Sequence, residues 1–233
     1  MFRQLAQNVQ RYHEFLLDTA RRLYNTQEPH QNQLDWVASR LVGRTPKGEP
    51  LVPRDADSQP DAGDDSGDED NGGDRNDFLF RLEDRFGLAC PIGAHIRRAN
   101  PRDALDPDPN TALRLSKMHR IIRRGRIYGD RLFAADGEAA GKPDDPRGLN
   151  FICLNADISG QFEMVQHSWL NRTYFGGLHH ESDPMSHHPH GGTTMTIQHR
   201  PANLRIHVPQ LVRVRGGAYF FLPGIAALRS LDR

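Results

Sequence analysis

The sequence is poor in the residues that build disulfide scaffolds and membrane spans. It has two cysteines in 233 residues, Cys90 and Cys153, both in apolar settings and without the pairing of a metal site. We therefore expect buried free thiols and a reducing compartment. No run of about 18 apolar residues occurs, which argues against a membrane span. The N-terminus has neither a charged segment before an apolar core nor twin arginines, so a cytoplasmic protein is expected.

Apolar residues are also scarce, at 36% of the chain, and acidic residues are unevenly spread. Residues 55–77 contain ten acidic side chains and one basic one, Arg75, for a local charge of −9. Because the whole chain sums to zero, the remainder carries +9. A basic surface can attract nucleic acid, but no series of interleaved aromatic residues accompanies the arginines. We expect no nucleic-acid partner.

We expect a single domain that spans residues 1–233. Two of its segments have the composition of surface loops. Residues 45–77 are rich in proline, glycine, aspartate and serine, which predicts a mobile acidic loop, and they lack the glycine and glutamate register of an EF-hand. Residues 178–192 hold five histidines close to Glu181 and Asp183. Such a set suits zinc or nickel, but its glycine- and proline-rich context favours a flexible histidine-rich loop.

The remaining periodicity predicts helices interspersed with strands. Helices are expected over 1–25 and 31–42, the second with Gly43 as its C-cap, and over 158–171 and from 223 to about 231; strands are expected over 118–128, 149–154 and 218–222. This order predicts an α+β domain with helices packed on one face of an antiparallel sheet.

One stretch, CPIGAHIRRANPRD at 90–103, places a single histidine among cations. A neutral imidazole at His95 is a suitable axial ligand for iron, and Arg97, Arg98 and Arg102 are suitable partners for porphyrin carboxylates. By spacing alone, a histidine among arginines is more often part of a polar surface.

The amino-acid sequences of several segments, and the order of these segments along the chain, resemble those of the dye-decolourising (DyP-type) haem peroxidases. The stretch 90–103 is similar to that family's proximal-histidine signature, and HRIIRRGRIYG at 119–129 to the segment with its distal arginine. GLNFICLNAD at 148–157, QFEMVQ at 161–166 and VRGGAYFFLP at 214–223 also match. The resemblance covers most of the chain. It implies the C-terminal half of the family fold, a ferredoxin-like domain of the dimeric α+β barrel type, with haem b as the cofactor.

The resemblance implies that His95 is the axial ligand of the haem iron. A ligating histidine usually donates its other ring nitrogen to an acceptor that fixes its orientation. Asp157 is the candidate acceptor, with Glu163 as the second choice. Asp157 is equally well placed to cap the helix expected to begin at residue 158.

On the opposite side of the haem, the resemblance assigns the distal catalytic arginine to Arg123. A fixed cation there would stabilise charge that develops as peroxide is cleaved. Arg124 has the opposite parity on the same strand, so one of the two faces the cofactor and sequence alone leaves Arg124 as the alternative. Leu149 and Phe151 share a strand face and would line the haem pocket, although ordinary strand core explains them as well.

One part of the family's pattern is missing, because no Gly-x-x-Asp-Gly motif with the distal aspartate occurs. The leading hypothesis is a haem peroxidase that reduces hydrogen peroxide and oxidises one-electron donors such as dyes and phenolics, impaired by that absence, with Trp169 or Tyr219 as electron relays. The alternative is a truncated or degenerate module that binds haem or a partner without turnover. A separate N-terminal half or a second copy is the expected protein partner.

Overall fold

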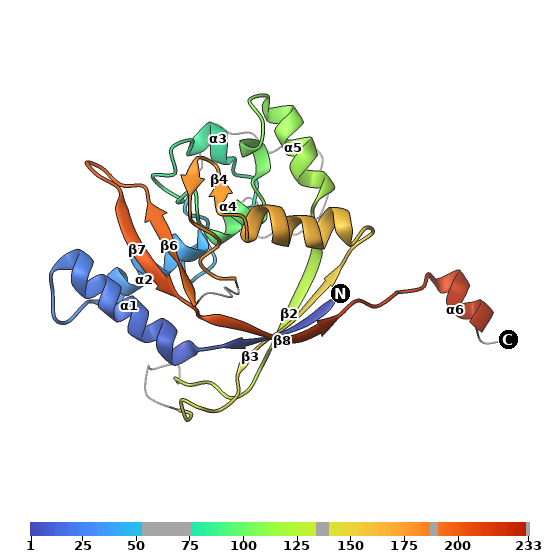
Figure 1. The fold of residues 1–233 in the computed structure, drawn as a ribbon, viewed down its shortest axis with the longest axis horizontal. Coiled ribbons are helices and arrows are strands. Elements are labelled where there is room, and N and C mark those ends of the chain that lie inside the picture. Colours follow the sequence, from blue (N-terminus) through green and yellow to red (C-terminus); the bar gives the residue numbers. More distant parts are fainter. Residues whose placement is uncertain (53–75, 134–139, 187–190, 232–233) are drawn as a thin grey trace, which may run out of the picture.

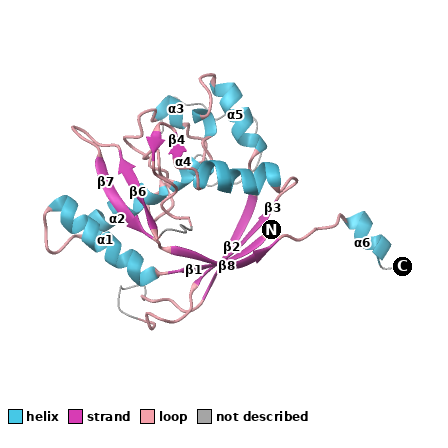
Figure 2. Cartoon of the chain, viewed as in Figure 1, coloured by secondary structure: helices cyan, strands magenta, loops and turns pink. Residues whose placement is uncertain are grey.

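The computed structural model describes residues 1–52, 76–133, 140–186 and 191–231. Its elements in these ranges are β1 (Phe2–Gln7), α1 (Val9–Tyr24), α2 (Gln31–Val42), α3 (Phe80–Glu83), α4 (His95–Ala99), η1 (Arg102–Ala104), α5 (Pro109–Met118), β2 (Ile122–Tyr128), β3 (Gly148–Leu154), η2 (Ser159–Glu163), η3 (Val165–Leu170), β4 (Tyr174–Phe175), β5 (Leu178–His179), β6 (Gly192–Ile197), β7 (Leu204–Pro209), β8 (Val212–Ala218) and α6 (Ile225–Leu231). The expected α+β class with an antiparallel sheet is confirmed (Figure 2).

The main sheet has the order β2-β3-β1-β8, with antiparallel neighbours throughout. The helix predicted over 1–25 is therefore wrong in its first third, where residues 2–7 form β1 between two strands from distant parts of the chain. Asn8 separates strand from helix, because its side chain accepts a hydrogen bond from the backbone N–H of Arg11 and caps α1. The helix predicted over 31–42 is confirmed and ends at Gly43, whose φ is +94°.

The hydrophobic core cluster lies mainly between α1, α2 and the hairpin β6–β7, and it reaches the main sheet at Val212 of β8 and Leu5 of β1 (Figure 1). Apolar residues at helical spacing on α1 and α2 meet alternate residues of the two strands. The fully or almost fully buried members include Ala20, Val37, Leu41, Met195, Ile197, Ile206 and Val208, together with Cys90 and Ala94 next to α4. This core therefore also fixes the segment that precedes His95.

One face of the main sheet is covered by η2 and η3, the coil that lies above it in Figure 1. The Arg3 guanidinium donates to the Gln166 side chain and lies 4.9 Å from the centre of the Phe162 ring. Phe151 packs against the same ring at 6.3 Å. The predicted helix over 158–171 is thus present, wound as two short π-helical segments.

At the C-terminal end of the described chain, the sequence prediction is wrong for the last strand and correct for the start of α6. The strand expected over 218–222 is wrong, because β8 spans Val212–Ala218 and its pairing with β1 ends where Phe2 meets Ala218. Residues 219–224 then lead away from the body of the molecule to α6 (Figure 1). Helix α6 begins just after Pro223 and Gly224, as expected.

The segment expected as a strand over 118–128 divides into the end of a helix and a shorter strand. Helix α5 (Pro109–Met118) was not among the predicted helices. Pro109 occupies its first turn and Asp108 caps it by accepting a hydrogen bond from Thr111 N–H. Strand β2 begins only at Ile122. The strand expected over 149–154 is confirmed as β3 with one added residue.

The two predicted loops lie partly outside the described residues. Of the acidic loop, residues 53–75 are not described, and the described start forms a turn closed by pairing of Arg44 with Pro50. Of the histidine-rich loop, residues 187–190 are not described. Its described first half contains β5 and the buried carboxylates Glu181 and Asp183, so the prediction of a surface loop is wrong there. None of the helices in the described ranges is long and apolar enough to cross a membrane.

Candidate functional site

His95 is the first residue of α4 and faces a carboxylate from a distant segment. Its Nδ1 lies 2.8 Å from Asp183 Oδ2, across 88 positions of sequence. The Asp183 side chain is completely buried, whereas the His95 side chain keeps 36% of its surface exposed. The imidazole is therefore held on one edge and open on the other.

This contact fixes the tautomer of the neutral imidazole. An ionised carboxylate only accepts hydrogen bonds, so Nδ1–H is the donor and Nε2 carries the free lone pair. Burial opposes a charged imidazole, but the charge of Asp183 and the hydrogen bond outweigh it and raise the pKa of His95. The pKa of Asp183 is lowered: burial favours its neutral form, and His95, the Met185 N–H and Arg98 together overcome that effect.

The acceptor expected from sequence is wrong, because Asp183 occupies the place assigned to Asp157 or Glu163. Asp157 lies before η2, where the Gln161 side chain accepts from its backbone N–H. Glu163 accepts from the Tyr219 hydroxyl at 2.7 Å. The sequence placed Asp183 only beside the histidines of residues 178–192 and not opposite His95, which lies 88 positions away along the chain.

A buried arginine joins α4 to the segment that carries Asp183. Arg98 has no exposed surface, and its guanidinium donates to the backbone carbonyls of Trp169, Arg172 and Glu181 at 2.6–3.1 Å. Its positive charge also helps to lower the pKa of Asp183. Arg98 is thus a clamp that holds the two partners of the histidine–aspartate pair in register.

The other expected carboxylate-binding arginines are engaged within the protein as well. Arg97 is buried, donates to Asp84 Oδ2 at 3.2 Å and to the Cys90 carbonyl at 2.9 Å. Arg102 donates to the carbonyls of Asn76 and Phe78 and lies 3.8 Å from the centre of the Phe78 ring. The assignment of Arg97, Arg98 and Arg102 to porphyrin carboxylates therefore does not fit, because each guanidinium is held in place by hydrogen bonds to groups within the protein.

Arg123 lies on β2 and its charge reaches His95, where it opposes the rise of the imidazole pKa. The register pairs Arg123 with Cys153 and Gly125 with Phe151, and directly paired residues share a face of the sheet. Phe151 packs on η2, so Arg123 lies on the face that η2 covers. Arg124 pairs with Ile152 and belongs to the opposite face.

The apolar residues expected beside a cofactor lie on the same face as Arg123. Leu149 and Phe151 alternate with outward residues on β3, and both are partly buried. Gly125 leaves room next to them, since a Cβ there would come within 2.9 Å of Leu149 Cδ1. The arrangement combines an imidazole with a free Nε2, an exposed cation and a partly apolar strand face.

Both thiols are buried and free, as expected. Within the described ranges, no group of three or more histidine, cysteine or acidic side chains has a geometry that could hold a metal ion. Three histidines of the proposed zinc or nickel set, His187, His188 and His190, lie outside those ranges.

Comparison with known proteins gives one consistent group of relatives, although no protein-family model matches the chain. The multifunctional dye peroxidase DyP2 of Amycolatopsis sp. is 32% identical over 241 residues, covering 99% of this chain and 48% of that protein. The dye-decolorizing peroxidase of Exidia glandulosa is 30% identical, covering 97% of this chain and 44% of that protein. The chain thus spans about half the length of the curated relatives it matches.

Solved structures give the same result. The DyP2 structure from Amycolatopsis sp. superposes with a TM-score of 0.72 at 30% identity, over 98% of this chain and 48% of that one. A mutant of the decolorizing peroxidase from Auricularia auricula-judae superposes with a TM-score of 0.73 at 26% identity, over 97% of this chain and 51% of that one.

Proposed function

We propose that this chain, which is related to the DyP-type peroxidase family over about half of that family's length, binds haem b through His95 and takes part in peroxide reduction. The observation that carries the proposal is the His95–Asp183 pair, with Arg123 near enough to act on the same imidazole. A bound haem would supply the iron-centred redox chemistry that reduces hydrogen peroxide and oxidises one-electron donors.

The protein's own groups would divide the remaining work. Asp183 would orient the His95 ring and increase the electron donation of Nε2 by accepting the Nδ1 proton. Arg123 would attract peroxide and stabilise negative charge on its oxygens. Leu149 and Phe151 would exclude water from the strand side of the cofactor. Arg97, Arg98 and Arg102 are not assigned to the haem carboxylates, because each guanidinium already donates to groups of the protein itself.

Two aromatic residues are suited to pass electrons from bulky reductants. Tyr219 is 49% exposed, and its hydroxyl donates to Glu163, a hydrogen bond that raises the pKa of the phenol. Trp169 is buried and meets the His119 ring edge-on at 5.2 Å. We assign the relay role to these residues as part of the same proposal.

The second candidate is a haem-binding module that needs a partner for turnover. Two observations favour it: the distal aspartate motif is absent, and the face of the main sheet opposite Arg123 carries Ile122, Ile152 and Leu154, which are 74%, 39% and 48% exposed. Exposed apolar patches commonly mark association surfaces. The partner would be a polypeptide with the missing half or a second copy of this chain. Proton transfer by a positioned acid–base group contributes about 10²–10⁴-fold to rate, so its absence would leave a weak enzyme.

Titration of the purified chain with hemin tests the proposal. We expect a Soret band that saturates at one hemin per chain, and loss of that saturable binding in His95→Ala. His119→Ala is the matched control, because His119 Nδ1 contacts the Gly160 carbonyl rather than a carboxylate. Binding that is unchanged in His95→Ala would refute the assignment.

Peroxide turnover then separates the two candidates. The chain with bound hemin, called the loaded chain below, is mixed with hydrogen peroxide and a phenolic or dye reductant. Product formation is followed by absorbance. Product formation above that of free hemin supports the enzyme; saturable binding without turnover supports the module. Sedimentation velocity of the loaded chain would show whether a second copy is bound.

A further inference from the structure

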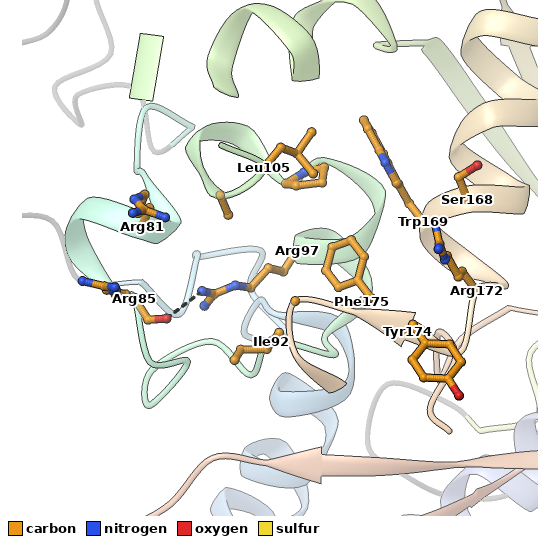
Figure 3. A pocket seen from close by; sticks show the side chains of 13 residues that line it. Arg81, Arg85, Ile92, Arg97, Leu105, Ser168, Trp169, Arg172, Tyr174 and Phe175 are labelled. Carbon is orange, nitrogen blue, oxygen red and sulfur yellow. Dashed lines mark hydrogen bonds between the residues drawn. The ribbon is translucent and has the colours of Figure 1, made fainter. Parts of the chain in front are cut away.

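A cavity of about 460 Å³ lies beside α4 and is not used by the proposed haem site. It is lined by thirteen residues from α3, the segment after it, α4, η1, η3 and β4. Figure 3 shows Arg81 and Arg85 on one side of this cavity, Trp169 and Tyr174 on the other, and Phe175 between them. A volume of this size admits a small organic ligand.

The cavity is strongly cationic. Four of its lining residues are Arg81, Arg85, Arg97 and Arg172, and none of the described lining residues is acidic. Arg97 is committed to Asp84, but within the described part of the chain no ion pair involves Arg81, Arg85 or Arg172. Arg85 and Arg172 are exposed, so their guanidiniums are accessible from solvent. Guanidiniums bind carboxylates through two parallel hydrogen bonds.

The opposite wall is aromatic. Trp169, Tyr174 and Phe175 line it, with Ile92 and Leu105 completing the apolar surface (Figure 3). The Phe175 ring is itself held in place, because the buried Arg98 guanidinium lies 4.9 Å from its centre. A planar ring in the cavity would therefore meet a fixed aromatic surface on one side and free cations on the other.

The cavity is separate from the open edge of His95. Arg97 lines it and His95 does not, although both lie on α4. Two positions along an α-helix correspond to a rotation of about 200°, so the two side chains leave α4 on nearly opposite sides. A ligand in the cavity and a cofactor on His95 would occupy different faces of this helix.

We propose that this cavity is a binding site for a planar aromatic carboxylate of one or two rings. The ring packs on the wall of Trp169, Tyr174 and Phe175, and the carboxylate pairs with Arg81 and Arg85. The site does not depend on the proposed haem site, because none of its contacts involves His95, Asp183 or Arg123.

Calorimetric titration of the haem-free full chain with 2-naphthoate tests the proposal, with neutral 2-naphthalenemethanol as the matched probe. We expect saturable binding of naphthoate at one site and binding of the alcohol that is about tenfold weaker or more. Arg81→Gln/Arg85→Gln should weaken naphthoate binding about tenfold, and Tyr174→Ser by about two- to tenfold. Arg11→Gln, an exposed substitution on α1, is the control and should have no effect.

Four results would overturn the inference. These are no saturable binding of naphthoate at millimolar concentration, equal affinity for the alcohol, an equal loss in Arg11→Gln, and competition between naphthoate and hemin for the same site. Circular dichroism of each variant shows whether it is folded. If the double variant does not fold, Arg85→Gln alone, at an exposed position, is used instead and should also weaken naphthoate binding. Because binding is measured without haem, a chain that fails to bind hemin leaves this result unaffected.

Discussion

Asp183 Oδ2 lies 2.8 Å from His95 Nδ1, and this partly buried hydrogen bond joins the helix of the candidate ligand to a segment 88 residues away. The carboxylate also accepts the backbone N–H of Met185 at 2.9 Å. Its position is therefore set by its own backbone as well as by the imidazole. This relationship, more than the local run of arginines, gives the site its geometry.

Replacing Asp183 tests that relationship directly. Asp183→Asn removes the charge while keeping the shape, and its single amide oxygen can accept from the Met185 N–H or from His95 Nδ1–H but not from both. With the oxygen on Met185, the NH2 group faces His95 Nδ1 and the imidazole loses the acceptor that fixes its tautomer. Loss of such a partner typically costs about 10–100-fold in metal affinity or activity. We expect a loss of this size in hemin affinity, measured by absorbance titration. Asp157→Asn is the control and should bind hemin as the parent does; an equal loss in both variants would contradict the assignment.

The two adjacent arginines of β2 should differ in their effect on turnover. Arg123 faces the covered side of the sheet and influences His95, whereas Arg124 pairs with Ile152 on the other face. If the loaded chain has peroxidase activity, Arg123→Leu should lower its kcat about 10²–10³-fold, as expected for loss of one preorganised donor. Arg124→Leu should change kcat little. Steady-state oxidation of a phenolic donor distinguishes the two, and the reverse order would exchange their assignments.

The arginine clamp under α4 should be needed for stability. In Arg98→Met three backbone carbonyls lose a charged donor, and one unmet buried hydrogen bond of this kind costs about 1–3 kcal/mol. We expect the free energy of unfolding to fall by about 3 kcal/mol or more in urea denaturation. Arg124→Met, at an exposed position, should change it by less than about 0.5 kcal/mol. A small effect of Arg98→Met would show that the carbonyls find water instead.

Gly43 ends α2 in a conformation and a space that only glycine fits. Its φ is +94°, and a Cβ there would lie 2.4 Å from Ile96 Cγ1, next to His95. Gly43→Ala should lower the free energy of unfolding by about 2 kcal/mol or more, because both backbone strain and steric overlap destabilise the folded state. Urea denaturation followed by circular dichroism measures this change. Gly48→Ala has a similar φ of +90° with no atom within 4 Å, so it isolates the cost of strain alone. Equal losses in the two variants would mean that Ile96 yields without cost.

The buried thiol of Cys90 should resist alkylation in the folded protein. Burial is the largest influence on it and raises the pKa to about 12, although Arg97 acts in the opposite direction. A folded pKa above the ordinary value of about 8.5 gives stability that is present below pH 8.5 and is lost as the pH rises toward 12. We expect negligible labelling of Cys90 by iodoacetamide between pH 7 and 9, and rapid labelling in urea. Peptide mass spectrometry would detect labelling of the native thiol, which would contradict its burial.

Local sequence patterns were sufficient to predict much of the fold and two residues of the candidate site, His95 and Arg123. Helix α2 and its glycine cap follow from periodicity and capping, and strand parity on β2 and β3 reduced the choice on β2 to Arg123 or Arg124. The pairing of residues 2–7 within the sheet could not be predicted, because their partners in β3 and β8 lie more than 140 residues away along the chain. Asp183 was missed for the same reason. The arginines after His95 were misassigned because sequence shows their charge but not the carbonyls that occupy it.

The place of β1 in the sheet has a consequence for the order in which the protein is built. Strand β1 is made before both of its neighbours, and Phe2 lies opposite Ile152 of β3 and Ala218 of β8, which follow it by 150 and 216 positions. During synthesis one edge of β1 has no partner until β3 is complete at Leu154, and its other edge has none until β8 is complete at Ala218. Sheet closure of such long sequence separation is slow. We therefore expect the α1–α2 region to gain helical structure early and the four-stranded sheet to assemble last.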